Sequence, residues 1–210
     1  HGLLVMGMYF NDQMGRHILD VPGLGASHTL HVLYSPEHGI RGTHEAGAEV
    51  ASERGAVPVI SLYGKRTRPT AAELSEIGYF LIDLQDIGSR YYTYMATMRE
   101  CLSACAQAKK PVLILDRPNP LGGAVLEGPI AERTGSPVCC APIPVRHGMT
   151  MGELAVFFLR EEFSKQKLNL SVQLLDSWRR DALFDECAYP WVAPSPNIPT
   201  PLTARVYVGT

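Results

Sequence analysis

A glutamate, a histidine and an arginine lie close together in the string SPEHGIRG, as Glu37, His38 and Arg41. Acid–base chemistry and the binding of anions use a carboxylate, an imidazole and a guanidinium. Because Pro36 cannot donate a hydrogen bond to a sheet, the apolar strand predicted at 29–34 should end there. Glu37 is therefore the first candidate for a catalytic residue. The alternative is a simple ion pair between Glu37 and Arg41 on a surface turn.

Two more polar segments directly follow predicted strands. Residues 79–83 and 112–116 are apolar runs of strand length, and the segment from 146 precedes a predicted helix. The carboxyl ends of parallel strands share one edge of a sheet, where ligands bind. We therefore expect a cleft lined by the polar residues that follow the strands, which are Glu37, His38, Arg41, Gln85, Asp86, Arg90, Asp116 and Arg117. Arg146 and His147 lie just before the predicted helix, in a loop that we expect to be exposed.

Strands alternate with helices along the chain, which predicts an α/β fold with a parallel sheet and right-handed crossovers. The expected strands are 3–6, 29–34, 57–64, 79–83, 112–116 and 171–175, and the final residues 203–210 also resemble a strand. The expected helices are 71–77, a segment ending near 109, and one within 144–163. Capping-box spacing at Thr70 and Glu73, and again at Thr150 and Glu153, indicates two helix starts and gives these side chains structural roles.

The composition excludes several classes of protein. The chain has 210 residues, of which 46% are hydrophobic and 19% charged, with a formal net charge of -2. These values are typical of a globular domain and give no reason to expect nucleic acid as a partner. No apolar stretch approaches the ~18 residues of a membrane span. The 5 scattered cysteines lack the spacing of a zinc site and favour reduced thiols over a disulfide framework.

The sequence contains no recognised cofactor loop. Residues 23–28 form a broken G-x-G-x-x-G motif that precedes a strand, whereas a dinucleotide site needs a helix there. We therefore expect no cofactor. A metal-dependent hydrolase built on His38, His44 and His147 is an alternative, but these histidines lack a recognised ligand spacing. We expect no metal.

The predicted cleft contains carboxylates and arginines without a standard nucleophile. The chain has no G-x-S-x-G, no P-loop and no H-E-x-x-H motif. Carboxylates alone suit the cleavage of a glycosidic bond, in which one acid protonates the leaving oxygen. Arginines that bind carboxylates predict an anionic substrate. A pair of catalytic carboxyl groups about 5 Å apart would indicate retention at the sugar, and roughly 6.5 to 9.5 Å would indicate inversion.

Six unusual strings identify a resemblance to a known family. They are SPEHGIRG, VISLYGKRTRPT, LIDLQDIGSRYYTYMATM, VLILDRPNPLGG, IPVRHGMTMGELA and APSPNIPTP. In this order and spacing, from about residue 34 to 210, they closely resemble the exo-β-N-acetylmuramidase (NamZ-like) family. The resemblance implies a Rossmann-like domain with an open, mainly parallel sheet and helices on both faces. It also implies release of N-acetylmuramic acid from the non-reducing end of peptidoglycan fragments; the lactyl carboxylate of that sugar would explain the arginines.

The resemblance also implies roles for individual residues. Glu37 is the expected catalytic carboxylate, and Asp116 and Asp86 are the first candidates for a second catalytic group. Glu153 ranks behind them because of its capping role. The remaining residues of the matching strings are expected to bind a peptidoglycan-derived sugar or muropeptide, and they are His38, Arg41, Gln85, Arg90, Tyr92, Arg117, Asn119, Arg146 and His147.

Two departures from the family concern the ends of the chain. Residues 6–10 are MGMYF where family members carry an Asn-Thr-Gly-like loop, so a catalytically degenerate protein that binds peptidoglycan fragments is the alternative to an enzyme. We expect residues 1–210 to be a Rossmann-like catalytic domain, truncated at the N-terminus and without the smaller C-terminal domain. The family implies a periplasmic or extracellular location, whereas the unpaired cysteines favour the cytoplasm.

Overall fold

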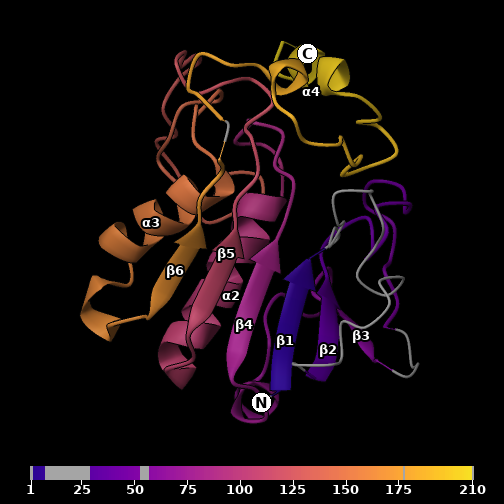
Figure 1. Cartoon of the computed structure of the whole chain (residues 1–210), viewed down its shortest axis with the longest axis vertical. Coiled ribbons are helices and arrows are strands. Elements are labelled where there is room, and N and C mark those ends of the chain that lie inside the picture. Colours follow the sequence, from indigo (N-terminus) through magenta and orange to yellow (C-terminus); the bar gives the residue numbers. More distant parts are fainter. Residues whose placement is uncertain (1, 8–28, 53–56, 177, 210) are drawn as a thin grey trace.

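Six parallel strands form one open sheet in the order β3-β2-β1-β4-β5-β6 (Figure 1). The computed structural model describes residues 2–7, 29–52, 57–176 and 178–209. This strand order is that of a doubly wound Rossmann fold, in which the order reverses between β1 and β4. The predicted α/β, Rossmann-like fold class is confirmed. The strands are β1 Gly2–Gly7, β2 Thr29–Ser35, β3 Val59–Ser61, β4 Tyr79–Asp83, β5 Val112–Leu115 and β6 Leu170–Gln173.

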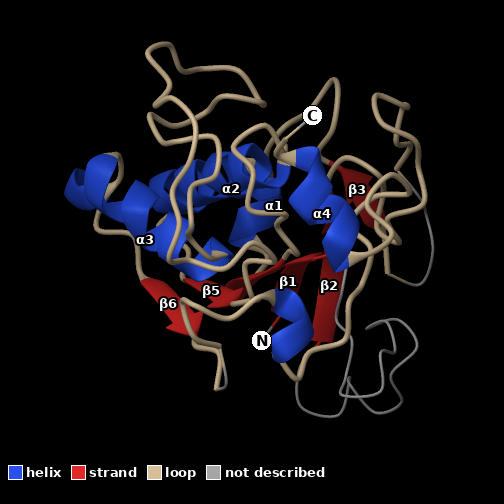
Figure 2. Ribbon diagram, turned by 90° about the horizontal axis from the view of Figure 1, so that it is seen from above, coloured by secondary structure: helices blue, strands red, loops and turns tan. Residues whose placement is uncertain are grey.

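One helix follows each of the strands β3, β4 and β5, and these three helices lie on the same side of the sheet (Figure 2). They are α1 Ala71–Ser75, α2 Tyr94–Ala108 and α3 Met151–Glu161. A fourth helix, α4 Pro201–Tyr207, and the short 3-10 helices η3 Ser164–Gln166 and η4 Phe184–Glu186 complete the described elements. Among the described residues, no helix has both the length and the apolar character needed to cross a bilayer.

The main hydrophobic core lies between the sheet and these helices. Side chains alternate between the faces of a strand, so Phe80 and Ile82 of β4 belong to the large core cluster, whereas Leu81 points to the opposite face. There it joins a smaller cluster with Leu33 and Val59. The helices expected on that second face would come from 8–28, which lie outside the described residues, and from the β2–β3 connection, whose described part contains turns and no helix.

The helix starts predicted from capping boxes are confirmed. Thr70 accepts from the backbone N–H of Glu73, and the Glu73 side chain accepts from the backbone of Thr70. Thr150 and Glu153 form the same reciprocal pair at the start of α3. Glu73 also accepts a hydrogen bond of 2.7 Å from the hydroxyl of Tyr34.

The strand expected at 203–210 is wrong, because residues 203–207 belong to helix α4 and residues 208 and 209 form a turn. The β-branched and aromatic residues near its end favour a strand. However, Thr200 is an N-cap whose side chain accepts from the backbone N–H of Thr203, and Pro201 occupies the first turn, where its missing N–H costs nothing. These local start signals outweigh the weaker strand propensity.

A matched pair of leucines tests where the core lies. Leu154 of α3 is 0% exposed within the core and Leu202 of α4 is 62% exposed. Leu154→Ala should lower the free energy of unfolding by about 2–5 kcal/mol, because it removes buried methyl groups and leaves a cavity. Leu202→Ala should change it by less than about 0.5 kcal/mol. Urea unfolding followed by circular dichroism measures both, and equal losses would contradict the assigned core.

Candidate active site

Glu37 lies in the turn that directly follows β2, at the carboxyl edge of the sheet. The next residue, His38, has a left-handed backbone with φ of 73°, a conformation in which non-glycine residues are uncommon and which is often found at functional sites. The Nδ1 atom of His38 lies 2.8 Å from the carbonyl oxygen of His44. Because a carbonyl only accepts, Nδ1 carries the hydrogen, and Nε2 is the free ring nitrogen in the neutral imidazole.

The carboxylate of Glu37 is turned inward and held by groups from other loops. Its side chain is only 8% exposed. The backbone N–H of Gly47 donates to Oε1 over 3.0 Å, the hydroxyl of Thr93 donates to Oε2 over 2.7 Å, and the hydroxyl of Tyr63 also hydrogen-bonds the carboxylate. The alternative of an outward-facing ion pair on a surface turn does not fit this burial. Arg41, the expected partner in that alternative, is exposed.

These contacts keep Glu37 ionised at neutral pH. Burial is the largest influence on its pKa and raises it, but the hydrogen bonds from Thr93, Gly47 and Tyr63 and the nearby His38 together outweigh burial and lower the pKa below its usual value. A buried acid with a lowered pKa is a carboxylate rather than a proton donor.

Aromatic side chains from the loop after β4 pack against this turn. The ring of Tyr92 stacks on His38 with centroids 6.2 Å apart, and Tyr94 meets Tyr92 edge-on at 4.6 Å. The hydroxyl of Tyr94 lies 3.1 Å from the carbonyl oxygen of Glu37 and 2.6 Å from that of Pro194. Tyr94 therefore ties the Glu37 turn to the proline-rich segment near the end of the chain.

Two of the predicted site residues brace loops instead of facing a cleft. The fully buried side-chain amide of Gln85 donates to the carbonyl of Pro118 over 3.0 Å, which joins the loops after β4 and β5. Asn119 donates to the carbonyl of Met149 over 2.9 Å and accepts from the backbone N–H of Leu121 over 2.9 Å. The NH2 groups of both amides donate to backbone carbonyls, and Gln85 Oε1 has no hydrogen-bond partner among the described residues.

The predicted arginines differ in what they bind. Arg90 is buried and donates to the carbonyls of Pro129 and Ile143 over 2.8 and 2.6 Å. Arg146 is partly exposed and pairs with Glu127 over 2.7 Å. Arg90 thus holds the loops together, whereas Arg146 has surface that a ligand can reach.

Asp86 and His147 form a buried pair. The His147 Nε2 atom lies 3.2 Å from Asp86 Oδ2, which also accepts from the backbone N–H of Gly88 over 2.8 Å. The other ring nitrogen, Nδ1, accepts from the backbone N–H of Met149 over 3.2 Å. The neutral imidazole therefore carries its hydrogen on Nε2, facing the carboxylate.

Arg117 pairs with an aspartate that the sequence did not single out. Its guanidinium holds both carboxylate oxygens of Asp83, one of them at 3.0 Å. Asp83 is the last residue of β4 and pairs in the sheet with Gly7 of β1, at the point where the strand order reverses. The signal that could have found Asp83 is its position at the end of an apolar strand, which it shares with Asp116.

Asp116 accepts hydrogen bonds from residues at the start of α3. It accepts from the hydroxyl of Thr150 and the backbone N–H of Gly152, both over 2.8 Å, and burial raises its pKa. β5 is three steps from β2 in the sheet, so at about 4.8 Å per step the ends of these strands lie roughly 14 Å apart. This exceeds the spacing of about 5 to 9.5 Å between paired glycosidase carboxylates. Asp86 follows β4, only two steps from β2, and is the nearer candidate partner for Glu37.

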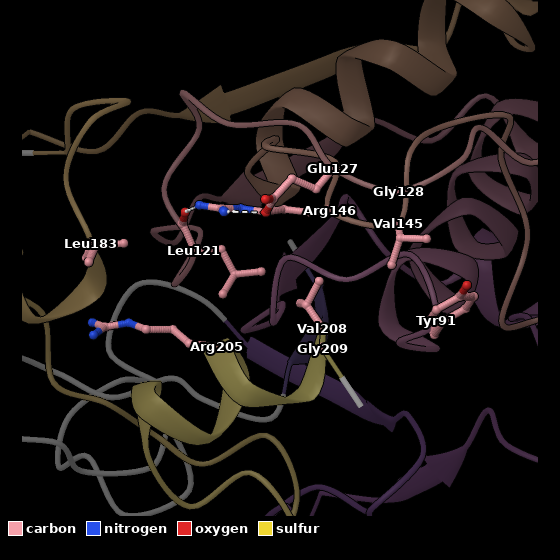
Figure 3. Close-up of a pocket in the computed structure, with 10 residues that line it drawn as sticks. All are labelled: Tyr91, Leu121, Glu127, Gly128, Val145, Arg146, Leu183, Arg205, Val208 and Gly209. Carbon is pink, nitrogen blue, oxygen red and sulfur yellow. Dashed lines mark hydrogen bonds and ion pairs between the residues drawn. The ribbon is translucent and has the colours of Figure 1, made fainter.

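A cavity of about 700 Å³ opens beside these loops (Figure 3). Arg146 and its partner Glu127 line it, together with Tyr91 from the loop after β4 and Arg205 of α4. Of the predicted site residues, Arg146 is the one that lines this cavity. The other lining residues are Leu121, Gly128, Val145, Leu183, Val208 and Gly209.

His38, His44 and His147 do not come together as a metal site. Within the part of the chain that the structure describes, no three His, Cys, Asp or Glu side chains are placed to share a metal ion. The Nδ1 atom of His38 meets the main chain of His44 instead of its ring, and His147 belongs to the pair with Asp86.

Sequence reasoning missed the residues that hold Glu37 in place. Thr93 and Tyr63 both reach the carboxylate, but neither carries a type or spacing that marks a site. Each comes from a loop after a different strand, so only the folded sheet brings them to Glu37. The run of polar and aromatic residues after β4 was the single available signal, and Thr93 lies inside it.

The fold and this carboxyl edge define a Rossmann-like α/β domain with an acidic candidate site. The family model described as "Exo-beta-N-acetylmuramidase NamZ, N-terminal" matches residues 4–202. The chain therefore belongs to the NamZ family. A relative from Bacillus subtilis (strain 168), named peptidoglycan beta-N-acetylmuramidase NamZ, is 45% identical over 185 residues, which are 86% of this chain and 44% of that protein.

Two solved structures from Bacteroides fragilis NCTC 9343 share the fold. Both are described as DUF1343 family proteins. The first has a TM-score of 0.86 and 34% identity, and the second has 0.76 and 28%. Each match covers 99% of this chain and 53% or 55% of the other. The chain thus spans about half the length of the relatives it matches.

The hydrogen bond from Thr93 should set the ionisation of Glu37. Thr93→Val keeps the side-chain shape but removes the hydroxyl that favours the charged carboxylate, so the pKa of Glu37 should rise. A carbon-detected NMR titration of the Glu37 carboxyl group measures it. Thr97→Val is the control, because the Thr97 hydroxyl donates to a main-chain carbonyl one turn earlier in α2. An unchanged pKa in Thr93→Val would show that this contact does not hold the carboxylate.

Proposed function

We propose that this protein is a glycoside hydrolase that releases N-acetylmuramic acid from the non-reducing end of peptidoglycan fragments, with Glu37 as the catalytic carboxylate. The observation that carries the proposal is the environment of Glu37, a buried and ionised carboxylate at the carboxyl edge of the sheet. Membership of the NamZ family and the activity named for the Bacillus subtilis relative support it.

The direction of the pKa shift favours one catalytic role for Glu37. Cleavage of a glycosidic bond proceeds through a transition state with positive charge on the sugar ring, and needs both a carboxylate and a proton donor. A general acid needs a raised pKa, whereas the pKa of Glu37 is lowered. Glu37 is therefore suited to act as a nucleophile, as a base, or as the negative charge that stabilises the ring cation.

Asp86 ranks ahead of Asp116 as the second group in this proposal. Asp116 has a raised pKa, as a proton donor needs, but it follows a strand that lies roughly 14 Å from β2. Asp86 comes from the loop that also supplies Thr93 to Glu37, and it forms a buried pair with His147.

The substrate carboxylate needs an accessible guanidinium. Arg90 is buried, and the side chain of Arg117 is only 11% exposed. Arg41 is exposed and lies four residues after Glu37. By this exposure and position, the proposal assigns Arg41 to the lactyl carboxylate of muramic acid, which a guanidinium can bind with two hydrogen bonds. In this proposal, the stacked rings of His38 and Tyr92 form one wall of the sugar-binding site.

A protein that binds peptidoglycan fragments without cleaving them is the second candidate function. The observation that favours it is that both oxygens of Glu37 already accept hydrogen bonds, from Gly47 and Thr93, and that Tyr63 adds a third. A carboxylate held in this way can shape a site without reacting.

The location of the protein in the cell is also part of the proposal. Peptidoglycan lies in the bacterial cell envelope, which supports a location in the periplasm or outside the cell. The 5 cysteines, all free, are the pattern of a reducing compartment. Fractionation of cells with an antibody to the protein would decide between the two.

The two candidate functions differ in the effect of Glu37→Gln on product release. In the complete gene product, Glu37→Gln should lower the release of chromophore from a chromogenic β-N-acetylmuramide by at least about 100-fold, because the carboxylate acts in the transition state. Glu45→Gln is the matched control, since Glu45 is an exposed glutamate eight residues away. Urea unfolding confirms that both variants are folded.

The glucosamine analogue of the substrate tests specificity in the same assay. The wild type should prefer the muramide, because only that sugar carries the lactyl carboxylate. Turnover by Glu37→Gln within tenfold of the wild type would remove Glu37 from the mechanism. Binding of muropeptides by the wild type without any product would favour the second candidate function.

A further inference from the structure

Tyr63 follows β3 at the same height in the sheet at which Glu37 follows β2. Ser35 of β2 is paired with Ser61 of β3, and the backbone N–H of Leu62 then donates to the carbonyl of Ser35 over 2.8 Å. Glu37 and Tyr63 each lie two residues past this last pair, on neighbouring strands about 4.8 Å apart. The sheet thus brings the two residues side by side, in agreement with the hydrogen bond between the Tyr63 hydroxyl and the Glu37 carboxylate.

The loop that carries Tyr63 is fixed at both ends. At its start, the Ser61 hydroxyl accepts from the backbone N–H of Tyr63 over 3.3 Å, and the Ser61 N–H donates to the hydroxyl of Ser52 over 3.1 Å. Three residues after Tyr63, the guanidinium of Arg66 pairs with Glu73 at the start of α1, and one of their hydrogen bonds is 2.9 Å long. These contacts limit the movement of the loop, so the Tyr63 hydroxyl has a defined position.

Hydroxyl groups reach Glu37 from two sides of its strand. In the sheet, β3 lies on one side of β2, and β1 and then β4 lie on the other. Tyr63 comes from the side of β3, whereas Thr93 comes from the loop after β4 and donates over 2.7 Å. The backbone N–H of Gly47 is a third donor. A rotation of the carboxylate away from either side therefore breaks one of these hydrogen bonds.

Tyr63 keeps its own proton at neutral pH. Burial raises the pKa of its hydroxyl most, and the hydrogen bond to Glu37 and the negative charge of that carboxylate raise the pKa further. The hydroxyl is thus a hydrogen-bond donor to Glu37 and is poorly suited to protonate a leaving group. Tyr63 and His38 are the titratable groups that act on the pKa of Glu37, whereas Thr93 and Gly47 supply uncharged donors.

We propose that Tyr63 is a positioning residue for the proposed hydrolysis, whose hydroxyl holds the Glu37 carboxylate from the side of β3 while Thr93 holds it from the other. A carboxylate that meets developing positive charge acts best when it is already oriented, because no reorganisation is then needed during the reaction. The loop after β3 thereby joins the loops after β2 and β4 in the site. The inference rests on the proposed function, which defines the reaction that Glu37 serves.

Tyr63→Phe tests the inference in the complete gene product, because it removes only the hydroxyl. On the chromogenic β-N-acetylmuramide, kcat should fall about tenfold, the scale of one hydrogen bond to a charged group, and KM should change by less than about threefold. The lost hydrogen bond favoured the ionised acid, so the pKa of Glu37 should rise, and the acidic limb of the pH profile of kcat/KM should move to higher pH. Tyr79→Phe is the matched control and should leave all of these unchanged, because Tyr79 is 53% exposed at the start of β4, at the opposite edge of the sheet.

A double substitution shows whether Tyr63 acts through Glu37. In Glu37→Gln the carboxylate is replaced by an amide, so the addition of Tyr63→Phe should lower the residual rate by less than about twofold. A further tenfold loss in the double variant would overturn the inference, and so would a Tyr63→Phe variant with the kcat and pH profile of the wild type. Urea unfolding confirms that the variants are folded.

A titration without substrate separates this inference from the proposed function. Carbon-detected NMR should give a higher pKa for Glu37 in Tyr63→Phe than in the wild type or in Tyr79→Phe. If this rise is seen but the wild type cleaves no muramide, the hold of Tyr63 on the carboxylate stands and the hydrolase proposal fails. If the wild type cleaves the muramide but Tyr63→Phe changes neither this pKa nor kcat, the hydrolase stands and the role of Tyr63 fails.

Discussion

The hydrogen bond between the Thr93 hydroxyl and the Glu37 carboxylate joins two halves of the sheet. Glu37 follows β2 and Thr93 precedes α2, on opposite sides of β1. The bond favours the ionised acid, so Glu37 contributes stability above its unfolded pKa of about 4.5 and loses it as the pH falls through the lower folded value. The interaction that shapes the site therefore also stabilises the fold at neutral pH.

Buried polar side chains support this contact by fixing the neighbouring loops. Gln85, Asn119 and Arg90 all donate to main-chain carbonyls of other loops, and Asp86 pairs with His147. Burying such groups is costly unless they are hydrogen-bonded. These hydrogen bonds fix the loops relative to one another, while Gln85 Oε1, Asp86 Oδ1 and Arg90 Nε are buried without a hydrogen-bond partner in the described part of the chain.

Local rules were sufficient to predict most of the fold. Apolar runs such as 79–83 and the capping boxes at Thr70 and Thr150 depend on neighbours in the sequence, and the structure confirms them. The end of the chain failed because strand propensity at 203–210 competed with a helix start at Thr200. For the site, the sequence placed the polar loops at the carboxyl edge of the sheet, where the structure has them, but it could not identify side chains that brace a loop, such as Gln85. Such roles depend on contacts such as Thr93 with Glu37, which only the folded sheet creates.

The hydroxyl of Tyr94 links the assembly of the site to the order in which the chain folds. It reaches the main chain at Glu37, 57 residues earlier, and at Pro194, 100 residues later. Contacts between such distant segments form only after large loops have closed, which is slow. A nascent chain that has not yet emerged as far as Pro194 thus lacks part of the scaffold behind Glu37. The scaffold behind Glu37 is therefore complete only after the segment around residue 194 has been synthesised and has packed on the loop after β4.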